Sequence, residues 1–482
     1  MNRNNNKNNL GNLNRHRAQI ACLFLFGSWS LSAGAGTEFH PHGVVSGTWM
    51  DNISLVGDTD PNRESAYLLQ VNPGFTLLEK ARRFNGALDY TMQNRFFPQE
   101  SDRNSTFHQA TANFQAELAQ DYLFLDGVGS YSQQLIDPRL PTNNGNLFET
   151  TNQTDALTTS LTPALRHNFD ALHVEASYTR GHVEYKKTVA SGLLQNADTE
   201  TRDALVGSVD DDAVLTWHAH YQSQRAIYKT AQEFRYDQAD GELGLLFEKS
   251  LRIIGRGGRE SDPRLDLGKG GLDSSYWEGG FRWQSSERTN AEAFYGKRFF
   301  GNSYNGRLRH EGRYATWNLS YSETPLTQAQ ESLLQPVAFD PRTQGGFTPG
   351  TQDFARATAD VFIRKTAEAS VHIAGQRTQI DLSVSDYRRE YLNSTLGLEH
   401  HRAGSLSIIR NLSARTQMIV GGTIDRTNLI GGYQFHENST RVEFDHQLGD
   451  HISITLGAFR RWRTGNLPFI VDWVTLGVTG HY

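Results

Sequence analysis

Two groups of neighbouring side chains have the types and spacing that could hold a metal ion. The first is Glu399, His400 and His401, because imidazole and carboxylate groups are common ligands of divalent metals. Adjacent residues of a β-strand point to opposite faces, so two neighbouring imidazoles on a strand cannot chelate one ion without a bulge. We therefore expect these histidines to lie on two different surfaces and not to bind a metal together.

The second group is Asp210–Asp212, whose carboxylates are of the type that calcium favours when oxygen ligands cluster. The segment lacks the spaced Asp/Asn and Gly residues of a calcium-binding loop, so we expect a solvated turn. No glycine-rich phosphate loop follows a strand and opens a helix. Among 17 His and many Ser and Asp, no Ser-His-Asp set stands out. The sequence thus predicts no catalytic residue, no metal, no cofactor and a protein that is not an enzyme.

The elements that carry these residues are β-strands, because polar and apolar residues alternate along most of the chain. In segment 109–118, Gln109, Asn113 and Glu117 share a polar face, and Ala and Phe residues occupy the positions between. Successive side chains of a strand point to opposite faces, so such a segment has one apolar and one wet surface. The alternation recurs in segments 88–93, 172–179, 277–284, 317–322, 380–385 and 442–448.

Short and long connectors between these strands favour an outer-membrane barrel over a soluble β-sandwich, which also alternates. We expect tight turns at residues 79–83, 119–121, 168–170 and 448–451. We expect longer polar loops at residues 98–105, 136–154, 259–274 and 428–439. Strands of about 12–16 residues are long enough to cross a bilayer at a tilt. In hydrocarbon every backbone group must be paired internally, and strands achieve this only by closing into a barrel.

The predicted fold is therefore all-β, a large antiparallel transmembrane β-barrel of about 20 strands, with about 18–22 as the range. Segment 324–352, which contains Gln, Pro and Gly, fits no strand. It is a surface loop, a constriction folded into the lumen or a periplasmic excursion, and the sequence does not choose among these three.

Composition and charge agree with a barrel and exclude one class of partner. Hydrophobic residues make up 37% of the 482 residues, whereas aromatic residues reach 11% and Gly occurs 44 times. A polar lumen with aromatic girdles at the rims has this composition. The formal net charge is −6, so the chain lacks the basic footprint of a nucleic-acid-binding protein.

The N-terminus has the three parts of a secretory signal peptide. Residues 1–17 carry Arg and Lys without an acidic residue, an apolar run follows, and Ala33 and Ala35 form a small-x-small cleavage site. We predict a signal peptide over residues 1–35 and an outer-membrane β-barrel over residues 36–482. The single cysteine, Cys22, lies in the signal, so the mature chain would have neither a disulfide nor a thiol metal site.

The C-terminus resembles the signal by which the outer-membrane assembly machinery recognises its clients. A polar residue, a glycine and a terminal aromatic residue are present as Thr475, Gly477 and Tyr482, but Gly480 stands where a hydrophobic residue is usual. We expect the barrel assembly machinery and outer-membrane lipid as partners, and the bacterial outer membrane as the location.

Several short blocks, taken in order along the mature chain, resemble the outer-membrane proteins associated with the PEP-CTERM (exosortase) protein-sorting system of Gram-negative bacteria. These blocks are Asp51–Ile53, Val71–Gly74, Leu88–Tyr90, Ser101–Asn104, His108–Gln109, Leu123–Asp126, Ser130–Gln134, Tyr295–Tyr304 and Trp317–Glu323. The resemblance implies a role beside exopolysaccharide production, in export or surface assembly, with exopolysaccharide or periplasmic export components as partners. It implies no catalytic residue.

The polar faces supply the candidate functional residues. The side chains expected to face the lumen are Gln109, Asn113, Glu117, Glu175, Asn318 and Asp381. Such groups exchange hydrogen bonds with water or sugar hydroxyls, so a channel or assembly factor for polysaccharide or surface material is our first hypothesis. A non-transporting barrel whose loops, such as 136–154 and 259–274, bind a polymer or protein is the second. A general diffusion porin is the third.

Overall fold

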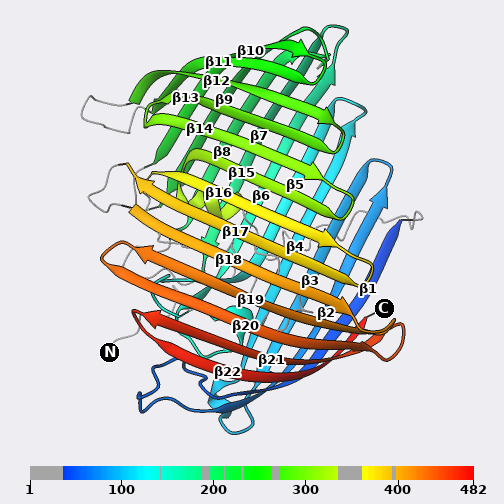
Figure 1. Ribbon diagram of the computed structural model, residues 1–482, viewed down its shortest axis with the longest axis vertical. Coiled ribbons are helices and arrows are strands. Elements are labelled where there is room, and N and C mark those ends of the chain that lie inside the picture. Colours follow the sequence, from blue (N-terminus) through cyan, green and yellow to red (C-terminus); the bar gives the residue numbers. More distant parts are fainter. Residues whose placement is uncertain are drawn as a thin grey trace, which may run out of the picture.

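The computed structural model describes residues 36–141, 143–186, 195–210, 212–229, 233–262, 272–334, 361–392 and 398–481. Within them, 22 strands each pair antiparallel with the next along the chain, and β22 pairs with β1 to close the sheet (Figure 1). Every strand therefore has two neighbours, and no edge is left unpaired. The predicted antiparallel barrel is confirmed, at the upper end of the expected range of strands. The signal segment, with Ala33 and Ala35, lies outside the described residues.

The bounds of the first strands are β1 (Thr37–Met50), β2 (Ala66–Ala81), β3 (Phe84–Phe96), β4 (Ser105–Ala119), β5 (Leu123–Leu135), β6 (Gln153–Asn168), β7 (Leu172–Tyr185), β8 (Ala197–Ser208), β9 (Leu215–Tyr228), β10 (Phe234–Glu248) and β11 (Leu251–Asp262). The remaining strands are β12 (Leu272–Ser286), β13 (Thr289–Arg298), β14 (Gly301–Glu311), β15 (Ala315–Leu326), β16 (Phe362–Ala374), β17 (Thr378–Tyr391), β18 (Leu398–Asn411), β19 (Thr416–Leu429), β20 (Tyr433–Gln447), β21 (Ile452–Gly465) and β22 (Phe469–His481).

In the described part of the chain, three short helices lie between the strands: the 3-10 helices η2 (Ser101–Arg103) and η3 (Asn144–Asn146), and the α-helix α2 (Gln328–Leu334). Among the described residues, no helix is long and apolar enough to cross a membrane.

The links at one end of the barrel are all short, and the long connectors lie at the other end, among some short ones. Residues 82–83, 249–250 and 287–288 link strands at the first end, and residues 51–65 and 136–152 do so at the second. In outer-membrane barrels the long connectors face outward and the short turns face the periplasm. We therefore call the second end the outer end. β1 begins at the inner end of the barrel, and β22 ends there.

The prediction of a long polar loop at residues 428–439 is wrong. β19 continues to Leu429 and β20 begins at Tyr433, so the link is short. Gly431 and Gly432 adopt φ values of 82° and 80°, which glycine takes without strain, and this permits the tight link. The polar residues at the start of β20 resemble a loop in sequence because one face of that strand meets the wet lumen.

The closing seam between β1 and β22 contains two of the residues of the predicted assembly signal. Thr475 lies opposite Thr48, and their hydroxyl oxygens are 2.8 Å apart and buried. Gly477 lies opposite Ser46 on the same face. Tyr482 falls outside the described residues. This hydrogen bond therefore adds a side-chain link to the backbone pairing of β1 with β22.

The outer surface of the barrel is apolar and carries aromatic side chains near both rims. On β22, Val474, Leu476 and Val478 are exposed on one face, opposite the face of Thr475. Exposed aromatic residues near the outer end are Trp49, Tyr67, Phe96, Trp277, Tyr295 and Tyr304, and those near the inner end are Tyr122, Phe169, Phe247, Trp283 and Tyr314. A lipid-facing apolar band between two aromatic girdles is the surface of an outer-membrane barrel, so the protein belongs in the bacterial outer membrane.

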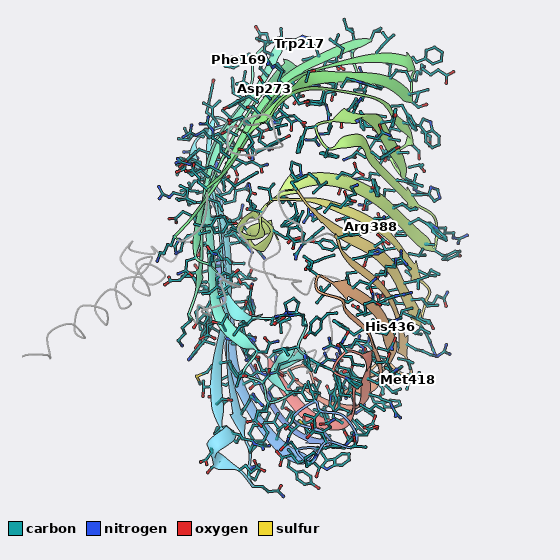
Figure 2. The ribbon with its side chains drawn as sticks, turned by 90° about the vertical axis from the view of Figure 1, so that its left-hand side faces the viewer. Phe169, Trp217, Asp273, Arg388, Met418 and His436 are labelled. Atoms are coloured by element: carbon teal, nitrogen blue, oxygen red, sulfur yellow. The ribbon has the colours of Figure 1, made fainter. Side chains whose placement is uncertain are left out.

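The barrel is flattened, so that two long walls face each other across the lumen (Figure 2). We call β4–β9 the first wall and β15–β20 the second wall. Helix α2 lies between the walls in this view. The lumen is therefore not an empty cylinder, and the side chains of both walls meet material supplied by connectors.

Candidate functional site

The lumen is the candidate functional site, and alternation along each strand selects the residues that line it. On β12 the exposed side chains Trp277 and Trp283 face lipid, so Glu278, which has the opposite parity, faces inward. Cross-strand partners share a face, so the register extends this assignment from strand to strand. Polar side chains dominate the inward face, which makes the lumen a wet surface.

The structure places the three candidates of segment 109–118 along one inward face of β4. Gln109 is buried, and its amide donates a hydrogen bond to the Gln133 side chain at 3.2 Å. Asn113 lies opposite Ala87 and Val128, and Glu117 lies further toward the inner end. The three side chains follow one strand and do not converge on a single point.

The other three candidates also have inward parity, but they lie on different strands. Arg166 donates to Glu175 at 2.8 Å, between β6 and β7. Asn318 on β15 donates to Ser370 at 3.4 Å. On β17, Asp381 lies 2.6 Å from an imidazole nitrogen of His372. The six candidates are therefore scattered around the barrel and line a surface, without forming one constellation.

The metal-binding alternatives separate as alternation predicts. The imidazole of His400 bonds Asp386 at 2.8 Å on the outward face, whereas that of His401 pairs with Asp425 on the inward face. In the turn after β8, the Asp210 carboxylate accepts a hydrogen bond from the backbone N–H of Asp212 at 2.9 Å. The described residues contain no group of three or more His, Cys, Asp or Glu side chains placed to hold a metal ion.

Buried charge networks on strands β9–β13 were not predicted from the sequence. Glu260 is fully buried, accepts a hydrogen bond from the Tyr236 hydroxyl at 2.8 Å and accepts one from Arg298 Nε at 2.6 Å. Closer to the inner end of the barrel, Arg256 donates a hydrogen bond to Glu242 at 2.6 Å. Alternation marks each of these residues as inward, but their partners come from other strands, so only the register could identify the networks.

Helix α2 spans the lumen from the first wall. The connector from β15 enters the barrel after Leu326, and the side chain of Gln330 donates to Gln224 on β9 at 2.8 Å. The Ala329 N–H donates to the Tyr228 hydroxyl at 3.4 Å. Leu333 packs against a buried apolar cluster of that wall, formed by Ile136, Ala156, Val183 and Tyr185.

The opposite side of α2 is held by an ion pair with the second wall. Glu331, which is almost fully buried, accepts hydrogen bonds from Arg389 and Tyr387 of β17. Arg364 of β16 lies 3.7 Å from the same carboxylate, and the Arg389 guanidinium lies over the Phe362 ring at 5.1 Å. Because one helix contacts both walls, we call it the α2 strut. The sequence left segment 324–352 unassigned. Its first part, residues 324–334, runs into the lumen and includes α2, whereas residues 335–352 lie outside the described residues.

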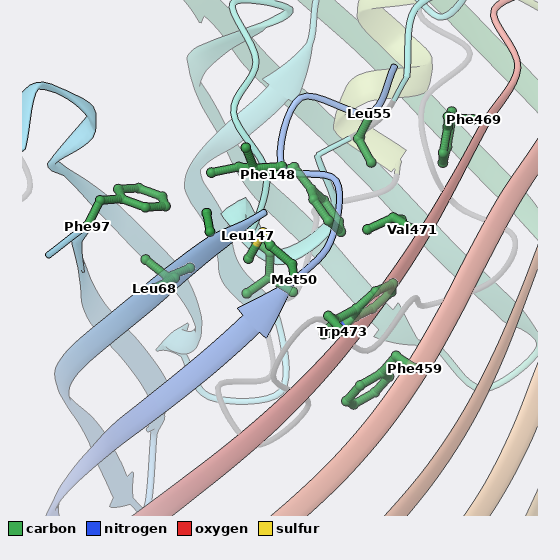
Figure 3. Close-up of a cluster of buried hydrophobic side chains, with 12 residues drawn as sticks. Met50, Leu55, Leu68, Phe97, Leu147, Phe148, Phe459, Phe469, Val471 and Trp473 are labelled. Atoms are coloured by element: carbon green, nitrogen blue, oxygen red, sulfur yellow. The ribbon is translucent and has the colours of Figure 1, made fainter. Parts of the chain in front are cut away.

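The connector between β5 and β6 also enters the lumen from the outer end. Leu147 and Phe148 are almost fully buried in a cluster with apolar residues of β1, β2, β21 and β22 (Figure 3). Phe148 meets Trp473 edge-on with ring centres 5.5 Å apart. Arg95 donates to the carbonyl oxygens of Leu147 and Phe148, at 3.2 Å each. Burial of these two side chains draws the centre of loop 136–154 into the barrel, so this part of the first candidate binding loop is not exposed at the surface. Of the second candidate loop, 259–274, residues 263–271 lie outside the described residues.

Comparison with known proteins finds solved structures of similar fold but identifies no family for this chain. No model of a known protein family matches the chain, and no curated protein matches it in sequence. The FrpB iron transporter from Neisseria meningitidis, F5-1 variant in its apoprotein form, superimposes with a TM-score of 0.51 at 10% identity, over 92% of this chain and 81% of that chain. The F3-3 variant gives a TM-score of 0.50 at 11% identity, over 93% and 82%. At such identity the likeness concerns the fold alone, and it is that of a large outer-membrane barrel.

Proposed function

We propose that this protein is a narrowed channel through which polysaccharide or related surface material crosses the outer membrane. The observation that carries the proposal is a closed barrel of 22 strands with a polar lumen that two connectors enter from the outer end. Barrels of about 16–18 strands already leave an aqueous channel, so one of this size has room for a hydrated chain even with a strut inside.

The α2 strut favours a selective passage over a general diffusion porin. It contacts both walls through hydrogen bonds, an ion pair and apolar packing, so the described lumen is divided rather than open. A channel built this way admits cargo that fits the remaining space or that displaces the strut.

The chemistry of the lumen supports a hydrophilic cargo. Gln109, Asn113 and Asn318 present amide groups, and hydroxyl side chains lie opposite two of them, Thr91 opposite Gln109 and Ser370 opposite Asn318. These groups exchange hydrogen bonds with sugar hydroxyls as readily as with water. The resemblance to PEP-CTERM-associated barrels supports polysaccharide as the cargo.

Uptake of an iron complex is the second candidate, and the strand number favours it. Outer-membrane transporters with 22 strands have a plugged lumen, and the similar structures are named as iron transporters. In this chain the described material inside the barrel comes from connectors between strands. If this candidate function is correct, these connectors are the part that must move to let an iron complex through the barrel.

A gene deletion separates these functions. We expect the deletion strain to lose surface polysaccharide while it takes up ferric chelates at the wild-type rate. Loss of ferric chelate uptake with normal polysaccharide would establish the second candidate instead. A change only in the entry of small sugars and amino acids would identify a porin, and polymer that is still exported but no longer attached at the surface would identify a binding barrel.

A further inference from the structure

A row of small hydroxyl side chains crosses five neighbouring strands of the second wall at one height. The register pairs Ser370 with Ser383, and Ser383 with Ser405. It then pairs Ser405 with Thr423, and Thr423 with Ser439. Directly opposite residues of antiparallel strands share a face, so the five hydroxyl groups form a continuous band on the lumen side. We call these five residues the hydroxyl row.

Hydrogen bonds within the hydroxyl row use only part of its capacity. The hydroxyl oxygens of Ser383 and Ser405 are 2.6 Å apart, and those of Thr423 and Ser439 are 2.7 Å apart. Each hydroxyl offers one donor and two acceptor lone pairs, so each pair keeps acceptor sites and one donor for a further partner. The row is thus prepared for a ligand that itself carries many hydroxyl groups.

A cavity of about 320 Å³ lies against this row. The aromatic residues Phe148, Phe459 and Trp473 also line this cavity. The rings of Phe459 and Trp473 are stacked with centres 5.0 Å apart. A cavity of this volume that is lined by aromatic side chains and a few polar groups is typical of a small-ligand site.

Trp473 provides an independent sign of a ligand at the same place. Its side chain lines the cavity and is 5% exposed, and its indole Nε1 has no hydrogen-bond partner among the described residues. Buried donors are rarely left without a partner in folded proteins. A ligand oxygen that reached this edge of the cavity would supply one.

The charges around the cavity argue against an anionic ligand. Three carboxylates, Asp381, Asp425 and Glu437, line it, and each already pairs with a basic side chain. Arg461 donates to Glu437 at 2.8 Å, so its charge is compensated. A site for an anionic polymer or a ferric chelate of negative charge would instead gather guanidinium groups without acidic partners.

We propose that the hydroxyl row, together with Trp473 in the lining of the same cavity, is a binding subsite for a neutral saccharide chain. The inference rests on the proposed function, because it identifies where the cargo contacts the lumen and which class of polysaccharide passes. Several weak hydrogen bonds in a row hold a moving chain without trapping it, which is the balance that conduction requires.

Calorimetric titration of the full folded protein in detergent tests this subsite. The probes are a linear neutral gluco-oligosaccharide, an oligouronate of equal length and ferric citrate. We compare the wild type with the double variant Ser383→Ala/Ser405→Ala. The control is Thr162→Val/Thr179→Val, which removes a hydroxyl pair of similar geometry, 2.8 Å apart, from the first wall. Heat-modifiable gel mobility verifies that each variant is folded.

We expect the wild type to bind the neutral oligosaccharide and the Ser383/Ser405 variant to bind it about five-fold or more weakly, since hydroxyl groups that contact the sugar are lost. The control should bind as the wild type does. Absence of binding to the neutral probe, tighter binding of the oligouronate or of ferric citrate, or equal weakening in both variants would overturn the proposal.

Conductance of the wild type in planar bilayers separates this inference from the proposed function. A conducting barrel that does not bind the neutral oligosaccharide would refute the subsite and leave the channel standing. A barrel that binds the oligosaccharide at the hydroxyl row but never conducts would refute the channel and leave the subsite standing.

Discussion

Glu331 and Arg389 show how single residues determine what the lumen contains. Their ion pair is almost fully buried, Tyr387 hydrogen-bonds both side chains, and Arg364 and Glu399 add a second opposite charge beside each partner, at 3.7 and 3.6 Å. Removing one partner of such a pair leaves a buried charge and costs about 3–5 kcal/mol. Neither residue is conspicuous in the sequence, because 58 positions separate them and their contact depends on the path of the connector.

A smaller effect is expected at the seam between the first and last strands. Thr475→Val keeps the shape of the side chain but removes its hydrogen bond to Thr48, and we expect a loss of about 1 kcal/mol of unfolding free energy. Urea unfolding of the barrel in detergent, followed by tryptophan fluorescence, measures this loss of free energy.

The yield of assembled barrel is a second measurement and tests the role of the seam in assembly. The control Thr162→Val removes a hydroxyl away from the seam, and its assembly yield should exceed that of Thr475→Val. Equal yields would show that the seam has no special role in assembly.

Among the elements, α2 begins with a capping box that is visible in the sequence. The Gln330 N–H lies 3.5 Å from the Thr327 hydroxyl, and the Gln330 side chain accepts from the Thr327 N–H at 2.9 Å. The pattern Thr-x-x-Gln predicts where a helix can start. It does not predict that this helix lies in the lumen, because that follows from contacts with β9 and β17, far away in the chain.

Thr327→Ala should weaken the start of the α2 strut by about 1 kcal/mol. We expect transient openings of the channel to become about five-fold more frequent in single-channel recordings. The control is Thr316→Ala, which lies on the lumen face of β15 toward the inner end, away from α2. It should leave the opening frequency unchanged. An unchanged frequency in Thr327→Ala would mean that the strut does not limit conduction.

The β5–β6 connector is held by side-chain burial, so its release is also testable. Phe148→Ala removes a fully buried ring, a change that costs about 3–5 kcal/mol in well-packed sites. We expect the connector to become sensitive to protease added to intact cells. Leu140→Ala, at an exposed position of the same connector, should remain resistant. Resistance of Phe148→Ala would show that burial of this ring is not what holds the connector in the lumen.

At the scale of the whole molecule, the sequence was sufficient to predict the barrel but not its interior. Alternation along segment 109–118 identifies the face of Gln109, since a strand has only two faces. The wet lumen also explains the error at residues 428–439, where inward polar residues of β20 resemble a loop. The hydroxyl row depends on the register of five strands, and the α2 strut depends on contacts across the lumen. Local sequence encodes neither.

The measurement that tests the central claim most directly is the conductance of single channels in planar bilayers, compared between wild type, Glu331→Gln and Glu260→Gln. Both substitutions neutralise a buried carboxylate bound by an arginine and a tyrosine, but only Glu331 lies on the α2 strut. We predict a small conductance in the wild type, a several-fold larger or more often open state in Glu331→Gln, and wild-type behaviour in Glu260→Gln. A folded wild-type barrel and a folded Glu331→Gln variant that both fail to conduct would contradict the account.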